Sequence, residues 1–199
     1  MSQKQLKKIQ INGATFCLDH RYQLVMDLVL PRFEQASLII DQLFGRDDKA
    51  AQLLIDAVLE DGCEDDVAMT YFLTMALQSY GELERAGVII ARMYHNNPSD
   101  LLAKCAYANN FMFHNALDEI PAVFNNTFDF EKVCTERELP LITFVQFMSI
   151  ACTYYFVKND SHNCIKYLSY LLEAAPEHPE TKRVFSWIER VCEKDEAEA

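Results

Sequence analysis

The spacing of apolar residues along Val67–Asp100 predicts two helices joined by a turn. Within each half, apolar residues recur every three or four positions, as they do on one face of a helix. The first face consists of Leu73, Ala76, Leu77 and Tyr80, and the second of Leu83, Ala86, Ile90 and Met93. Gly81 separates the two faces, and Pro98 ends the second helix because the residue before a proline disfavours helical backbone. Ser99 or Asp100 can then cap a third helix.

A turn residue followed five positions later by a small or apolar residue recurs along the chain. The four pairs are Gly45 and Ala50, Gly81 and Ala86, Asn115 and Ile120, and Asn159 and Cys164. The recurrence predicts four helical hairpins with turns at these glycine and asparagine residues. Extra residues near Phe128–Pro140 lengthen the last interval, where Thr135 and Glu138 are placed to form a capping box for the helix that follows.

Two further helices are predicted near the end of the chain. Leu141–Val157 is the longest uncharged run, and it falls short of the roughly 20 apolar residues that span a membrane. We therefore expect a buried helix there, with polar positions Thr143, Gln146, Ser149 and Thr153. Pro179–Cys192 predicts a covering helix with a stripe of Val184, Trp187, Ile188 and Val191, followed by a frayed and solvated acidic tail.

The first 30 residues predict a different kind of structure. Asp19–Leu30 has helical spacing and is followed by Pro31. Upstream, alternating residues flank Asn12-Gly13, the preferred two-residue turn of a β-hairpin. An isolated hairpin is only marginally stable, so it would pack on the helices or on a second copy of the chain. A homodimer through this N-terminal segment is therefore one expectation.

The unit at Val67–Asp100 resembles a tetratricopeptide repeat. Gly81 matches the turn position of that family, Ala86 the small contact residue of the second helix, and Pro98 the closing proline. The large aromatic residue near the start of the first helix is absent, because Thr70 stands there with Tyr71 beside it.

The resemblance covers about residues 31–178 and implies an all-α fold. It implies four antiparallel helical hairpins stacked as a right-handed superhelix. Residues 1–30 would form an N-terminal segment with the hairpin and a helix, and residues 179–199 a C-terminal capping helix with its acidic tail.

The resemblance also implies a concave groove lined by the first helix of each hairpin. The groove positions would be Gln35, Ile39 and Gln42; Tyr71, Phe72, Met75 and Gln78; Asn109, Met112 and Phe113; and Ser149, Thr153 and Phe156. None of them is lysine or arginine, so a clamp for a terminal carboxylate is not expected. Aromatic and methionine side chains there favour an apolar or amphipathic peptide. The same spacing also fits core residues, so Tyr71, Phe72, Phe113 and Phe156 are open to both interpretations.

Composition and charge restrict the partners. The chain has 199 residues, of which 50% are hydrophobic and 24% charged, and its formal net charge is −12. So acidic a protein repels phosphate groups, and we expect neither a nucleic acid nor a membrane as partner. The seven cysteines are widely spaced without a Cys-x-x-Cys pair, and no signal-peptide pattern begins the chain, which together predict a cytoplasmic location.

The residues that carry chemistry in enzymes do not form a recognisable constellation. Cys17 and His20 have the spacing of two metal ligands, but no second pair follows, so we expect no metal site and no cofactor. Carboxylates such as Asp65 and Asp66 precede predicted helices, where capping explains them.

The sequence therefore predicts a non-catalytic protein-interaction module that binds a peptide segment of a partner. The alternative is a small acidic chaperone that shields apolar segments of a client, since secretion chaperones of the same repeat type have similar size and charge. An enzyme is the third and least supported class.

Overall fold

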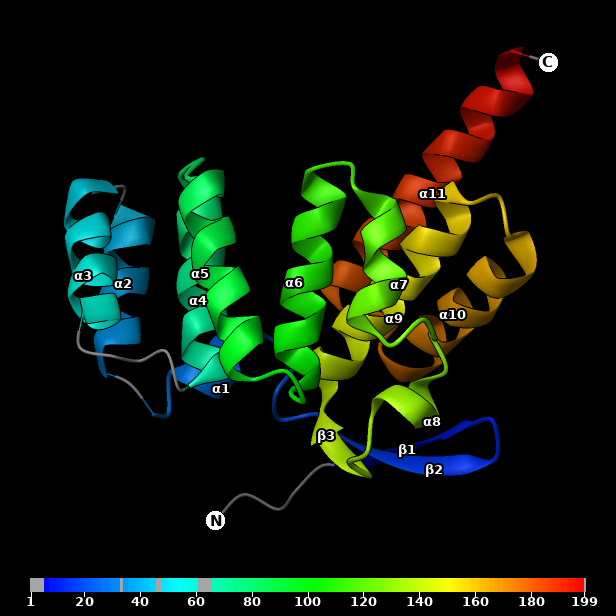
Figure 1. Ribbon diagram of the computed structural model, residues 1–199, viewed down its shortest axis with the longest axis horizontal. Helices are drawn as coiled ribbons and strands as arrows, with labels where there is room; N and C mark the ends of the chain where they lie inside the picture. The colour runs from blue at the N-terminus through cyan, green and yellow to red at the C-terminus, as the bar shows by residue number, and fades with distance from the viewer. Residues whose placement is uncertain (1–5, 33, 46–47, 61–65, 199) are drawn as a thin grey trace. The chain divides into compact units, whose positions relative to one another are not determined.

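The computed structural model describes residues 6–32, 34–45, 48–60 and 66–198 (Figure 1). The protein is 70% helical, with one small three-stranded sheet, as an all-α fold with an N-terminal hairpin predicts. Its contacts divide it into two compact units, Leu24–Val123 and the combination of Met1–Gln23 with Phe124–Ala199.

The unit Leu24–Val123 consists of helices. They are α1 (Val25–Val29), α2 (Glu34–Gly45), α3 (Asp48–Glu60), α4 (Val67–Ser79), α5 (Leu83–Asn96), α6 (Leu101–Phe113), the 3-10 helix η2 (Leu117–Glu119) and α7 (Ile120–Val123). Helices that follow one another pack as pairs, α2 with α3, α4 with α5, and α5 with α6 (Figure 1). α4 also contacts α1 and α6, so it lies inside this unit.

Local sequence fixes where these helices begin and end. The side chains of Asp66 and Asp100 each accept a hydrogen bond of 2.9 Å, from the N–H groups of Met69 and Ala103, and so cap α4 and α6. Gly81 has a φ of 81°, a left-handed conformation that favours glycine, and it separates α4 from α5.

The predicted asparagine turns are confirmed in the same way. Asn115 and Asn159 have φ values of 55° and 57°, and each lies just beyond the end of a helix. The apolar residues five positions after the predicted turns, Ala86, Ile120 and Cys164, are all buried. α2 ends at Gly45. The predicted turn after it falls on residues 46–47, which lie outside the described structure, as does the side chain of Ala50.

The second unit combines the sheet with four helices. Its strands are β1 (Leu6–Ile11), β2 (Ala14–Asp19) and β3 (Glu138–Pro140), in the order β1-β2-β3, and its helices are α8 (Phe130–Val133), α9 (Leu141–Val157), α10 (Ser161–Ala174) and α11 (Pro179–Glu198). β1 and β2 form the predicted antiparallel hairpin, with Asn12 and Gly13 at φ values of 50° and 95°. β3 pairs with β2 in the parallel direction.

Aromatic side chains fill the space between the sheet and the helices. Phe16 of β2 contacts Phe130 of α8 at a ring-centroid distance of 4.8 Å, and Phe130 contacts Phe144 of α9 at 5.3 Å. The first twelve residues of α9, Leu141–Cys152, are all buried, which confirms the prediction of a buried helix. No helix of the described part of the chain has the length and apolar character needed to cross a membrane.

Three expectations about local structure are wrong. Asp19–Leu30 is not one helix, because Asp19 ends β2 and only Val25–Val29 is helical. Thr135 and Glu138 do not form a capping box, because Glu138 begins β3 and Pro140 precedes α9. The acidic tail is helical and not frayed, because α11 continues to Glu198.

Candidate functional site

The predicted groove residues differ in exposure. Ile39, Tyr71, Phe72 and Ser149 are buried. Gln42, Gln78, Asn109, Met112, Thr153 and Phe156 are half-buried, and Gln35, Met75 and Phe113 are exposed. The expected groove is therefore not a continuous row of accessible side chains.

The four buried residues are core residues, so their prediction as groove residues is wrong. Tyr71 and Phe72 lie on α4, which packs against α1, α5 and α6, so that every residue from Ala68 to Thr74 is buried. Ser149 lies in the buried part of α9, and Ile39 has no exposed surface on α2. A side chain surrounded by its own core cannot contact a partner unless the fold opens.

Five accessible residues of the predicted set come from two adjacent helices, and we call them the α4/α6 surface. They are Met75, Gln78, Asn109, Met112 and Phe113. α4 and α6 contact each other, and α5 packs as the antiparallel partner between them in sequence, so α4 and α6 run in the same direction. Their C-terminal halves therefore lie at the same end of this unit (Figure 1).

The C-terminal halves of both helices carry accessible side chains next to buried ones. On α4 Met75 has 46% of its surface exposed, although Ala76 and Leu77, which follow it, are buried. On α6 the buried run covers Leu101–Ala106, and Phe113 at the end is 62% exposed. A large aromatic side chain left this exposed is a candidate contact for another molecule.

Aromatic contacts between α5 and α6 hold the second half of α6 in position. The rings of Tyr94 and Tyr107 stack with centroids 4.5 Å apart and an angle of 10°, and Phe111 meets Tyr107 edge-on at 4.9 Å. On α5, Gly87 leaves room for Asn110, whose Oδ1 atom would lie 3.2 Å from a Cβ atom at this glycine. The sequence pattern did not single out Tyr94, Tyr107 and Phe111, and the spacing of Tyr107 and Phe111, four positions apart, is the one local signal that they share a helix face.

The chemistry of the α4/α6 surface is amphipathic and uncharged. Met75, Met112 and Phe113 offer apolar contact area, and methionine adapts to differently shaped partners. Gln78 and Asn109 carry amide groups that can donate to and accept from a peptide backbone. Such a surface supports binding, and none of its groups is an acid, a base or a nucleophile.

The remaining predicted residues, Thr153 and Phe156, belong to the other compact unit. The ring of Phe156 meets that of Trp187 on α11 edge-on at 4.9 Å. α9 and α11 contact each other. α11 thus covers part of the Phe156 ring. Its half-burial fits neither a fully accessible groove residue nor a fully buried core residue.

The cysteine and histidine side chains, which could react or bind a metal, do not form a reactive site among the described residues. The Sγ atoms of Cys152 and Cys164 lie 3.7 Å apart inside the unit, and burial raises the pKa of both thiols, so they stay protonated and poorly nucleophilic. Burial, followed by the charge of Lys7, lowers the pKa of His20. The residues that the structure describes contain no group of three or more potential metal ligands, so Cys17 and His20 gain no further ligand within that part of the chain.

Comparisons of the chain with models of protein families, with curated proteins and with solved structures gave no match.

Proposed function

We propose that this protein is a non-catalytic interaction module that binds an apolar or amphipathic peptide segment of a partner protein at the α4/α6 surface. The observation that carries the proposal is the exposure of Phe113, at 62%, next to Met112 and near the amide group of Asn109. Accessible apolar side chains on adjacent helices can bind an amphipathic helix or an extended peptide.

The resemblance to tetratricopeptide repeats supports this proposal. Gly81, Asn115 and Asn159, three of the four residues at which the sequence pattern predicts turns, have left-handed backbone conformations. Binding between helices of such an array needs no charged anchor, which fits a surface without lysine, arginine, aspartate or glutamate among its five residues.

The experiment compares two equally exposed apolar residues of the same unit. Phe113 on α6 and Leu53 on α3 are both 62% exposed. Peptides selected from a displayed library of amphipathic sequences are titrated against the wild type, Phe113→Ala and Leu53→Ala. We expect Phe113→Ala to weaken binding at least about tenfold, the loss of roughly 1.4 kcal/mol, and Leu53→Ala to leave it unchanged. Equal losses in both variants, or none, contradict the proposal.

A chaperone that covers apolar segments of a client is the second candidate. The observation that favours it is that exposed large apolar side chains lie on several helices of both units, among them Leu38, Val88, Ile165 and Leu172. Exposed apolar side chains could cover segments of a client, and a net charge of −12 would keep the complex in solution. Co-purification with a client that precipitates when released favours the chaperone, whereas a partner that is soluble alone favours the interaction module.

A further inference from the structure

The outer edge of strand β1 is open. β1 stands at the end of the sheet order β1-β2-β3, and no strand of the described residues pairs with its other side. An open edge presents backbone N–H and C=O groups to which a further strand can hydrogen-bond. Many peptide-binding domains use such an edge.

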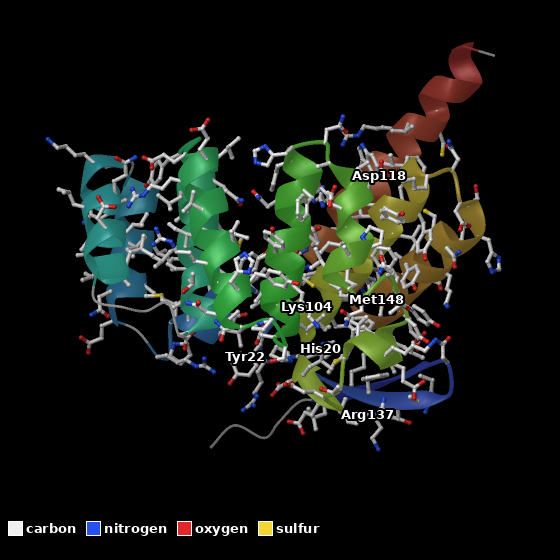
Figure 2. The ribbon with its side chains drawn as sticks, viewed as in Figure 1. His20, Tyr22, Lys104, Asp118, Arg137 and Met148 are labelled. Carbon is white, nitrogen blue, oxygen red and sulfur yellow. The ribbon has the colours of Figure 1, made fainter. Side chains whose placement is uncertain are left out.

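The hairpin register shows which groups point outward. Ile11 and Ala14 flank the two-residue turn, so this pair and, by alternation, the pair of Ile9 and Phe16 exchange hydrogen bonds across the strands. Lys8 and Gln10 fall between these pairs, so their N–H and C=O groups point to the open edge. Cys17, opposite Lys8, confirms the alternation, because its N–H points the other way and donates to the carbonyl oxygen of Arg137 at 2.8 Å. Arg137, which directly precedes β3, is labelled in Figure 2.

The edge is held firmly from the inside. Ile9 and Ile11 are buried beneath the sheet, while the side chains of Lys8 and Gln10 are exposed. The Nζ atom of Lys7 donates to the carbonyl oxygens of Glu173 and Ala174 at the end of α10, which ties β1 to that helix. A strand added to this edge would therefore meet a preformed backbone, with little ordering cost on this side.

Charge decides which kind of strand fits. Lys4, Lys7 and Lys8 precede Asp19, the first acidic residue of a chain whose net charge is −12. The ammonium group of Lys8 stands on the exposed face, so a neighbouring strand would place its own side chains beside it. A carboxylate on that strand is attracted by the ammonium group of Lys8, whereas the net negative charge of the rest of the protein repels it. The β1 edge is therefore the favoured place for an acidic segment.

The same charges argue against a second copy of the chain at this edge. Antiparallel pairing of two β1 strands would bring Lys8 of one chain near Lys8 of the other. It would also bring together two molecules that each carry a charge of −12. Like charges on facing strands are destabilising, and edge lysines are one way in which proteins prevent such self-pairing.

From the open backbone groups and the charge pattern, we propose that the β1 edge binds an acidic, extended segment of a partner protein as a fourth strand. Lys8 selects the charge, and the outward N–H groups of Lys8 and Gln10 supply the backbone hydrogen bonds. This surface belongs to the unit with the sheet, so the proposal is separate from peptide binding at the α4/α6 surface.

The test uses the full chain and a labelled ten-residue peptide of alternating glutamate and valine. Its control is the same peptide with lysine in place of glutamate. Binding is measured by fluorescence anisotropy, and backbone protection by hydrogen exchange followed by NMR. We expect the acidic peptide to bind and the basic one not to bind. The amide hydrogens of Lys8 and Gln10 should exchange at least about tenfold more slowly in the complex, as in newly formed hydrogen bonds.

Two variants identify the edge as the site. Gln10→Pro removes an outward N–H without removing a hairpin hydrogen bond, and Gln10→Thr keeps that N–H as the matched control. We expect Gln10→Pro and Lys8→Glu each to weaken binding about tenfold or more, and Gln10→Thr and Phe113→Ala to leave it unchanged. Unfolding temperatures of all variants check that the hairpin is intact.

Three results would overturn the proposal. The first is that neither peptide, or both peptides, bind. The second is binding that survives both Gln10→Pro and Lys8→Glu. The third is a concentration-dependent dimer, detected by sedimentation, that Gln10→Pro abolishes, since the occupant of the edge would then be a second copy of this chain.

Discussion

The hydroxyl group of Tyr167 on α10 donates a hydrogen bond of 2.6 Å to the backbone carbonyl oxygen of Phe128, which lies 39 residues earlier in the chain. Tyr167 is buried, and its ring stacks on that of Tyr155 from α9 with centroids 5.6 Å apart. One side chain thus fastens the segment before α8 to the pair formed by α9 and α10. This segment carries Phe128 and Phe130 into the aromatic core beneath the sheet.

Tyr167→Phe should lower the free energy of unfolding by about 1–3 kcal/mol, because it leaves the buried carbonyl of Phe128 without its donor. Urea unfolding followed by circular dichroism measures the change. Tyr170→Phe on the same helix is the control, since Tyr170 is only half-buried and we expect a change within about 0.5 kcal/mol. Equal effects of the two substitutions would show that the hydrogen bond contributes nothing.

Alkaline pH should destabilise the protein through the same tyrosine. Burial raises the pKa of Tyr167 above its ordinary value of about 10, and smaller shifts in the same direction affect Tyr155 and Tyr170. The unfolded chain therefore loses phenolic protons first, so stability is complete below about pH 10 and falls as the pH rises further. Urea midpoints measured from pH 8 to pH 11 should fall, and fall less steeply in Tyr167→Phe. An equal slope in both proteins contradicts the assignment.

The cysteines should differ in reactivity with iodoacetamide. Cys152 and Cys164 are buried with raised thiol pKa values, whereas Cys192 on α11 is exposed. Because the thiolate is the reactive form and needs access, we expect the native protein to be alkylated at Cys192 long before the buried pair. Mass spectrometry of a time course at pH 8 reports each site, and addition of denaturant should make the three rates similar. Early modification of Cys152 in the native protein would show that α9 is accessible.

Asp100, and not Ser99, caps α6, because its side chain accepts the N–H of Ala103 at 2.9 Å. Asp100→Ala should therefore cost about 0.5–2 kcal/mol in unfolding free energy. Ser99→Ala should change it by less than about 0.5 kcal/mol. Thermal unfolding of the two variants side by side tests the choice that the sequence left open between these residues, and a larger loss in Ser99→Ala would reverse it.

Features that depend on a few neighbouring residues were predictable from the sequence. The turn at Asn12-Gly13 and the turns at Gly81, Asn115 and Asn159 require left-handed backbone, which glycine and asparagine adopt most readily, so their residue types identified them. The length of Leu141–Val157 and its lack of charge likewise gave the bounds of α9.

Features that depend on distant residues were not predictable. β3 exists because Glu138 and Leu139 pair with Cys17 and Leu18, more than a hundred residues away, and nothing in Glu138–Pro140 alone distinguishes it from a capping segment. The helical spacing of its neighbours predicts that Asp19 belongs to a helix, but pairing with β1 and β3 on both sides extends β2 to that residue.

The exposure of the α4/α6 surface likewise depends on residues distant in the sequence. Helical spacing places Tyr71 and Met75 one turn apart on α4, but it does not say which of them the neighbouring helices cover. Tyr71, on a helix that contacts α1, α5 and α6, is 7% exposed, whereas Met75 is 46% exposed. Phe113, at the end of α6, has no such cover.

Alanine substitutions at Tyr71 and Phe113 should therefore have opposite consequences. Tyr71→Ala should lower the free energy of unfolding by about 3–5 kcal/mol, because it removes a buried aromatic ring and leaves a cavity. Phe113→Ala should change it by no more than about 0.5 kcal/mol, because that ring is already in water. Urea unfolding measures both changes, and circular dichroism of the native state shows whether helix content is kept. A large loss in Phe113→Ala would mean that Phe113 is a core residue, and the α4/α6 surface would then lose the side chain on which its role in binding depends.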